Sequence, residues 1–115
     1  MGTEKVRIAI PVVGGAISEH FGHSEKFEVY TVKDGKIEGS EDLVPPPHEP
    51  GVIPKWLNGI GANVIITGGI GRKAVELFNS YGITVVSGVS AMTAREAAEK
   101  YVEGNLDSTG ETCSH

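Results

Sequence analysis

The second half of the chain alternates short buried apolar runs with segments of helical periodicity, and this alternation restricts the possible folds more than any other feature. Residues 63–67 and 83–86 are short and rich in valine and isoleucine, which indicates buried strands. Residues 52–60, 72–82 and 93–102 carry apolar side chains at helical spacing. A helix between two strands makes a crossover that places the strands parallel in one sheet. The pattern therefore predicts an α/β domain.

The first half of the chain adds three predicted strands. Residues 5–13 are mostly β-branched or small, as is typical of a buried strand. Residues 26–32 and 36–43 flank Asp34-Gly35, a dipeptide typical of a tight β-hairpin turn. The proline-rich connector at residues 45–50 is incompatible with a helix.

Together these segments predict one domain with a five-stranded mixed sheet flanked by helices. Only the second strand should be antiparallel, and the expected order is 36–43, 26–32, 5–13, 63–67 and 83–86. The first two helices should cover one face and the third helix the other, because an uncovered apolar face would meet water. In topology alone this arrangement resembles a ribonuclease H-like sheet. The second helix should direct four side chains inward: Ala74, Val75, Leu77 and Phe78.

Composition and charge restrict the function. For 115 residues we expect one domain over residues 1–104 and a flexible polar tail over residues 105–115. The formal net charge of −5 argues against nucleic-acid binding, which needs a basic surface. No apolar run approaches the ~20 residues of a membrane span, and the N-terminus lacks a signal-peptide pattern. With a single cysteine there is no internal disulfide, so we expect a cytoplasmic protein without a membrane partner.

Two histidines, His20 and His23, follow the first predicted strand in the segment Ile-Ser-Glu-His-Phe-Gly-His-Ser at residues 17–24. The loops that leave the parallel strands should emerge at one edge of the sheet: 14–25, 44–50, 68–71 and 87–92. In open α/β sheets, ligands bind at this edge where the strand order reverses. We therefore expect His20, His23 and His48 to lie there beside a glycine-rich turn. The alternative is that they are ordinary loop residues.

The turn before the second helix reads Gly-Gly-Ile-Gly-Arg-Lys at residues 68–73. It matches neither a Walker A loop nor the Gly-x-Gly-x-x-Gly pattern. Amides at the start of a helix favour an anion, and Arg72 and Lys73 add positive charge. Because metal–sulfide clusters are usually anionic, Gly69, Gly71 and Arg72 are candidate contacts. Equally, the glycines could serve only a tight strand-to-helix turn.

Cys113 and His115 end the chain. Sulfur and imidazole donors suit iron, copper, zinc or an iron–sulfur assembly better than magnesium or calcium. The third helix should end at the edge opposite the histidines, but an extended tail of about 12 residues reaches about 40 Å. Three interpretations stay open: a ligand in the same chain, an intermolecular ligand, and a disordered end.

Three segments of the chain resemble the dinitrogenase iron–molybdenum cofactor biosynthesis family. They are Arg-Ile-Ala-Ile-Pro-Val at residues 7–12, the histidine segment at residues 17–27, and the glycine turn with its flanks at residues 65–74. The likeness covers about residues 5–104, and the histidine segment is its most specific part. The family includes nitrogenase accessory proteins and many short stand-alone proteins.

This resemblance implies a ribonuclease H-like α/β domain that binds or carries iron–sulfur or molybdenum-containing clusters and is not an enzyme. Family members keep a His-Phe-Gly segment, which makes His20, Phe21 and Gly22 candidate cluster contacts. His23 carries over less closely, because many relatives have arginine there. His48 lies in a variable connector, and the Cys-x-His ending resembles that of some short relatives.

We therefore predict non-enzymatic binding, carriage or storage of an iron–sulfur or molybdenum/iron–sulfur cluster for metallocofactor assembly. The expected metal ligands are His20, His23, His48, Cys113 and His115. The expected partners are cluster donor and acceptor proteins, and the chain should be a monomer or a weak homo-oligomer. Two alternatives are a small-anion or nucleotide-binding regulatory domain that uses the start of the second helix, and a cofactor-free interaction module.

Overall fold

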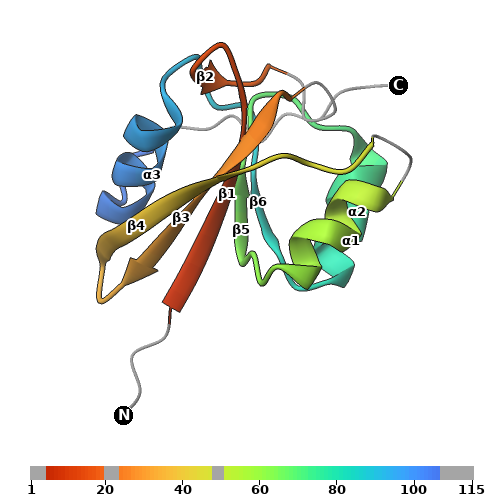
Figure 1. The fold of residues 1–115 in the computed structure, drawn as a ribbon, viewed down its shortest axis with the longest axis horizontal. Coiled ribbons are helices and arrows are strands. Elements are labelled where there is room, and N and C mark those ends of the chain that lie inside the picture. Colours follow the sequence, from red (N-terminus) through yellow and green to blue (C-terminus); the bar gives the residue numbers. More distant parts are fainter. Residues whose placement is uncertain (1–4, 20–23, 48–50, 107–115) are drawn as a thin grey trace.

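A mixed sheet separates two helices on one face from a third helix on the other in the computed structural model (Figure 1). The structure describes residues 5–19, 24–47 and 51–106. The strands are β1 (Lys5–Val13), β2 (Ala16–Ile17), β3 (Lys26–Lys33), β4 (Lys36–Leu43), β5 (Val64–Ile66) and β6 (Thr84–Val86). The helices are α1 (Val52–Gly59), α2 (Arg72–Ser80) and α3 (Ala94–Glu103).

The sheet runs in the order β4-β3-β1-β5-β6, and β2 pairs with β1. Strand β3 is antiparallel to both β1 and β4, whereas β5 is parallel to β1 and β6 is parallel to β5. The prediction of five strands with one antiparallel member is wrong, because the sheet includes β2 as a second strand antiparallel to β1. Two residues are too few to give a period-two pattern, so the sequence could not predict β2.

Side chains of β1 alternate between two separate cores. Ile8 and Ile10 belong to the core beneath α3, whereas Ala9 packs in the core beneath α1 and α2. Leu57 of α1 and Phe78 of α2 are fully buried in this second core. Burial on both faces explains why the central strands read as continuous apolar runs. The predicted placement of the helices on the two faces is confirmed.

Local signals set several element ends. Asp34 and Gly35 both have positive φ, 54° and 75°, which confirms the predicted tight turn between β3 and β4. The Thr93 hydroxyl accepts a hydrogen bond of 3.1 Å from the amide of Glu96 and so caps the start of α3. The expectation for Leu77 is wrong, because this side chain is exposed. Phe78 fills the core position that α2 offers there.

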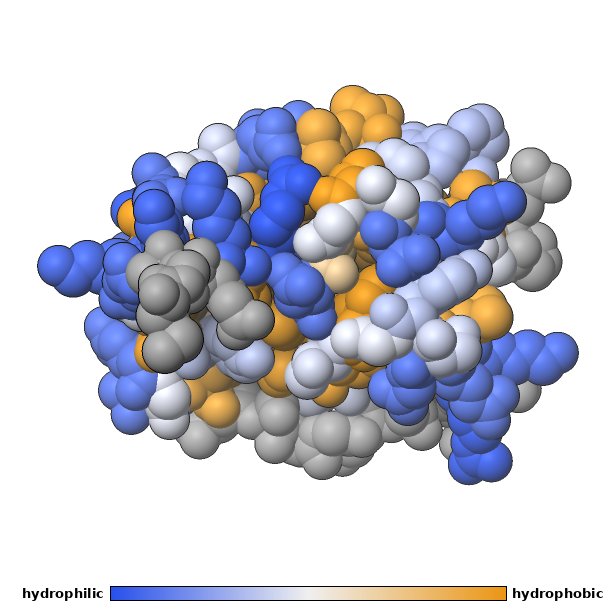
Figure 2. All heavy atoms as spheres, turned by 90° about the horizontal axis from the view of Figure 1, so that it is seen from below, coloured by the Kyte–Doolittle hydropathy of each residue, from blue (hydrophilic) through white to orange (hydrophobic). Residues whose placement is uncertain are grey.

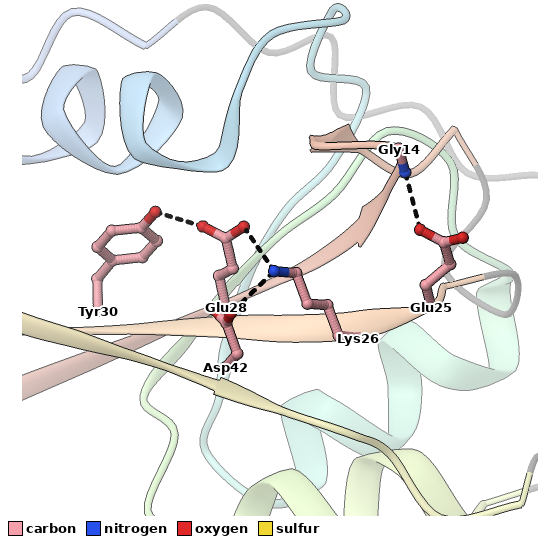
Figure 3. Close-up of polar contacts among 6 residues, drawn as sticks. All are labelled: Gly14, Glu25, Lys26, Glu28, Tyr30 and Asp42. Atoms are coloured by element: carbon pink, nitrogen blue, oxygen red, sulfur yellow. Dashed lines mark hydrogen bonds and ion pairs between the residues drawn. The ribbon is translucent and has the colours of Figure 1, made fainter.

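A polar cluster joins β3 to β4 and includes the buried side chain of Tyr30 (Figure 3). The Tyr30 hydroxyl donates a 2.5 Å hydrogen bond to Oε1 of Glu28. Lys26 Nζ lies 3.8 Å from Oε2 of Glu28 and 2.8 Å from Oδ2 of Asp42. Burial, and then the hydrogen bond to Glu28, raise the pKa of Tyr30 above its ordinary value. The Asp42 carboxylate raises the pKa of Lys26.

Figure 2 shows the molecule from below, at the end where β1 begins, and hydrophilic groups separate the hydrophobic ones there. Two ion pairs join the start of β1 to β4: Lys5 with Glu38, and Arg7 with Glu41. Across the described ranges, no helix combines the length and apolar character that crossing a bilayer requires.

Candidate functional site

Three loops meet at the carboxyl ends of β1, β5 and β6, at the top of Figure 1. The amide of Gly68 donates to the carbonyl of Ser18 at 3.1 Å. The carbonyl of Gly68 in turn accepts from the amide of Gly88 at 2.5 Å. The amide of Ile17 bonds to the carbonyl of Met92 at 2.9 Å, which ties β2 to the third loop. Residues far apart in sequence therefore form one hydrogen-bonded junction, as the shared strand direction predicted.

Gly68 lies close against the backbone of Ser18 and Glu19. A Cβ atom added there would lie 2.8 Å from the carbonyl oxygen of Ser18 and 3.0 Å from Cα of Glu19. Both are backbone atoms, which cannot rotate away as a side-chain end can. Only glycine fits between the β1 and β5 loops at this separation.

The described residues on either side of segment 20–23 are held by hydrogen bonds. Before it, the amide of Ser18 donates to Pro11 at 2.8 Å, and the carbonyl of Glu19 accepts from the amide of Gly69 at 2.6 Å. After it, the Glu25 amide donates to the carbonyl of Val12 at 2.9 Å. The Glu25 carboxylate accepts from the amide of Gly14 at 2.9 Å (Figure 3). Both flanks thus reach the sheet at the end of β1, beside β5, where the strand order reverses.

Hydroxyl groups line the same edge. Among the described residues, the buried polar side chains are Ser18, Thr67 and Ser87, which are 3%, 0% and 5% exposed. Thr67 and Ser87 directly follow the paired residues Ile66 and Val86, so they are neighbours at the ends of β5 and β6. Such groups donate or accept hydrogen bonds without carrying charge. These three buried side chains therefore make the edge polar without adding charge.

The predicted residues of the glycine turn lie at this edge. Gly71 is the N-cap residue of α2, and Arg72 is its exposed first residue. The Gly69 amide donates to Glu19, so a contact from this glycine to a ligand would use another atom or replace that bond. The remaining predicted site residues lie outside the described residues: His20, Phe21, Gly22, His23, His48, Cys113 and His115. Within the described ranges, no group of three or more His, Cys, Asp or Glu side chains could hold a metal ion.

Sequence reasoning missed the residues that shape the junction. Gly68 was one glycine among several in a turn, and nothing local distinguishes it from Gly69. Glu25 offered no motif, because its role depends on the nearby turn at Gly14. The buried hydroxyls had one weak signal, since Thr67 and Ser87 each follow a β-branched run at a predicted strand end.

Comparison with known proteins places this geometry in a family. The family model described as "Dinitrogenase iron-molybdenum cofactor" matches residues 4–104. The chain belongs to this family. The match includes the junction at Gly68 and both flanks of the 20–23 segment, so the predicted family resemblance is confirmed.

Individual relatives share the domain over almost their whole length. An uncharacterized protein of Methanocaldococcus jannaschii is 30% identical over 107 residues, which cover 89% of this chain and 90% of that protein. The crystal structure of PH0822 is 32% identical, with a TM-score of 0.84, and the match covers 92% of this chain and 96% of that one. The apo form of the orange protein from Desulfovibrio gigas has the same fold, with a TM-score of 0.73 at 24% identity, over 95% of this chain and 97% of that one.

Proposed function

We propose that this protein binds and carries an iron–sulfur or molybdenum-containing cluster as cargo for metallocofactor assembly. The family membership supports a role in the chemistry of the iron–molybdenum cofactor. The proposal is for binding rather than catalysis, with cluster donor and acceptor proteins as the partners. The assignment of the sheet to the ribonuclease H-like folds is part of the same proposal.

The observation that carries the proposal is that the residues on both sides of segment 20–23 are held by hydrogen bonds. The bonds from Ser18 and Glu25 to β1, and from Gly69 to Glu19, hold these flanks at the reversal of strand order. A ligand loop with fixed ends loses less conformational entropy on binding than a free one. His20 and His23 are therefore the proposed metal ligands in this segment. The further proposed ligands are His48, Cys113 and His115.

Charge at the edge supports an anionic cargo. Arg72 and Lys73 occupy the first turn of α2, both exposed, and that turn contains no acidic residue. The positive end of a helix favours an anion, and the two side chains add to this effect. Arg72 is the proposed partner of the cluster's negative charge, while Phe21 and Gly22 are proposed to shape its contact surface.

The test is anaerobic reconstitution of the purified protein with iron, sulfide and molybdate, after purification without a metal-affinity step. We expect visible cluster absorbance with stoichiometric metal and acid-labile sulfide. His20→Ala should abolish this absorbance, because the proposed iron site loses an imidazole ligand. Arg72→Glu should weaken retention of the cluster on gel filtration without changing its spectrum.

Control variants separate the residues. Lys55→Ala changes an exposed cation on α1 and should leave the spectrum unchanged. A folded wild-type protein that stays colourless after reconstitution would refute cluster carriage. An unchanged spectrum in His20→Ala would remove His20 from the site while leaving the other donors to be tested in the same way.

A small-anion or nucleotide ligand at the start of α2 is the competing proposal. The same exposed Arg72 and Lys73 favour it. Against it, the amides of Gly68 and Gly69 already donate to Ser18 and Glu19, so the turn offers fewer donors to an anion than its sequence suggests. Thermal stabilisation by phosphate that persists in His20→Ala and is lost in Arg72→Glu would favour this proposal over a cluster.

A further inference from the structure

The outer edge of β6 carries backbone groups that no described strand pairs. β6 ends the sheet order, so its pairing partner among the described strands is β5. The amide of Thr84 donates to Asn63, and the carbonyl of Val86 accepts from Thr67, both at 2.9 Å. The backbone groups of successive residues in a strand point alternately to its two sides. The amide and carbonyl of Val85 therefore point away from β5, toward the open edge.

A groove runs beside this edge, between β6 and α2. It has a volume of about 460 Å³, within the range of ligand-binding clefts. Its lining consists of Val75, Asn79, Gly82, Ile83, Thr84, Val85 and Ser87. Ser87 is 5% exposed, and its side chain lines the groove. The groove therefore combines a backbone edge with a nearly buried hydroxyl group.

The two edges of the sheet differ in charge. β4, at the other edge, carries charged side chains in ion pairs, such as Glu38 with Lys5 and Asp42 with Lys26. Its pairing with β3 also shifts register between Thr31 and Val32. Charges and irregular register are the usual protection of an edge against an added strand. No residue that lines the β6 groove is charged, although the chain has a net charge of −5.

We propose that the β6 edge binds an extended, uncharged segment of a partner protein as an additional strand. Main-chain groups of the segment pair with the amide and carbonyl of Val85, as in other cases of strand addition. A side chain of the segment enters the groove and bonds to Ser87 and Asn79. The lack of charge in the groove matches a segment without charge, because a buried unpaired charge is costly.

A second copy of this chain fits the groove less well than a peptide does. A two-fold pairing of β6 with β6 would place the same concave groove on both sides of the axis. Neither copy would then supply a group to fill the hollow at Ser87. An extended segment of a different protein has no such restriction.

The position of the groove suggests its use. Ser87 lies beside Thr67, and Gly88 bonds to Gly68 at the loop junction. A segment bound along β6 therefore ends next to the candidate site, at the edge where cargo would pass between proteins. The strand-addition proposal itself does not depend on the cluster proposal, because its residues are separate from the proposed ligands.

The test uses the full chain, labelled with nitrogen-15, and an end-capped hexapeptide of alternating threonine and valine. We expect saturable shifts of the Val85 amide and of the Asn79 side chain with peptide at millimolar concentration. Val85→Ala keeps the backbone amide but shortens a side chain that lines the groove, so it serves as the reference for the next variant. Val85→Pro removes the outward donor and places its ring at the pairing edge, a change that an edge strand tolerates, and should weaken binding at least tenfold relative to Val85→Ala. Ser87→Ala should weaken it about fivefold, since it removes one neutral hydrogen bond.

Three results would overturn the proposal. The first is the absence of saturable shifts at Val85 in a protein whose spectrum shows it folded. The second is equal affinity of Val85→Pro and Val85→Ala for the peptide. The third is a concentration-dependent shift of Val85 without peptide, which would identify a second copy as the occupant.

Discussion

Replacing Gly68 by alanine should destabilise the protein by about 2–4 kcal/mol. The added Cβ would lie 2.8 Å from the Ser18 carbonyl oxygen and 3.2 Å from that of Glu19. To make room, the two loops must separate, and overpacking of this kind costs about 1–3 kcal/mol. The separation also weakens the hydrogen bonds of Gly68 with Ser18 and of Gly69 with Glu19, at about 1 kcal/mol each.

The assay is urea unfolding followed by circular dichroism, with a thermal melt alongside. For a chain of this size, the loss corresponds to a melting temperature lower by roughly 8–16 °C. The matched control is Gly59→Ala in α1, where an added Cβ meets no atom within 4 Å. Alanine there should stabilise the helix by about 0.5–1 kcal/mol.

The two glycine variants should therefore change stability in opposite directions. Equal midpoints for Gly68→Ala and the wild-type protein would refute the argument that backbone contact at Gly68 fixes the junction. If Gly68→Ala is destabilised as expected, its cluster reconstitution should also fail at temperatures where it remains folded, because the flank at Ser18 and Glu19 has moved.

Two further predictions concern the core and the helix cap. Thr93→Ala should lower the free energy of unfolding by about 1 kcal/mol, because the Glu96 amide loses its acceptor. Thr93→Ser keeps a hydroxyl acceptor and should keep the wild-type stability. Equal losses of stability in the two variants would contradict the role of Thr93 as the cap. Since burial and Glu28 raise the pKa of Tyr30 in the folded state, the unfolded state loses this proton first as the pH rises. The stabilisation from Tyr30 is thus complete below pH about 10 and falls above it. Urea unfolding at pH 9 and pH 11 should show a smaller decline in Tyr30→Phe than in the wild-type protein, and an identical decline would exclude this cause.

Much of the architecture could be predicted from local patterns. The β-branched run of β1, the Asp34-Gly35 turn and the Thr93 cap each specify their own geometry within a few residues. The helices could be assigned to faces because crossover connections allow few arrangements. The pairing of β2 with β1 could not be predicted, since a two-residue strand has no periodicity of its own.

The sequence predicted where the candidate site lies, but not which atoms bond to one another there. Sequence reasoning located the edge where the histidine segment meets the glycine turn, and the bonds between Ser18, Glu19 and the two glycines lie there. It proposed Gly69 and Gly71 as ligand contacts, and the structure adds that the amide of Gly69 donates to the carbonyl of Glu19. Hydrogen-bond partners between distant segments depend on how closely the chains approach, which no local pattern records.

The sequence by itself determined which segments are strands and helices, and which family the chain belongs to, because backbone preference and apolar periodicity act over short distances. Only the tertiary structure decided that Gly68 must lack a side chain, since the obstacle is the backbone of Ser18 and Glu19. It also decided that the backbone amide and carbonyl of Val85 face an open sheet edge beside a groove. Both depend on which segments become neighbours after folding, and that follows from packing of the whole chain.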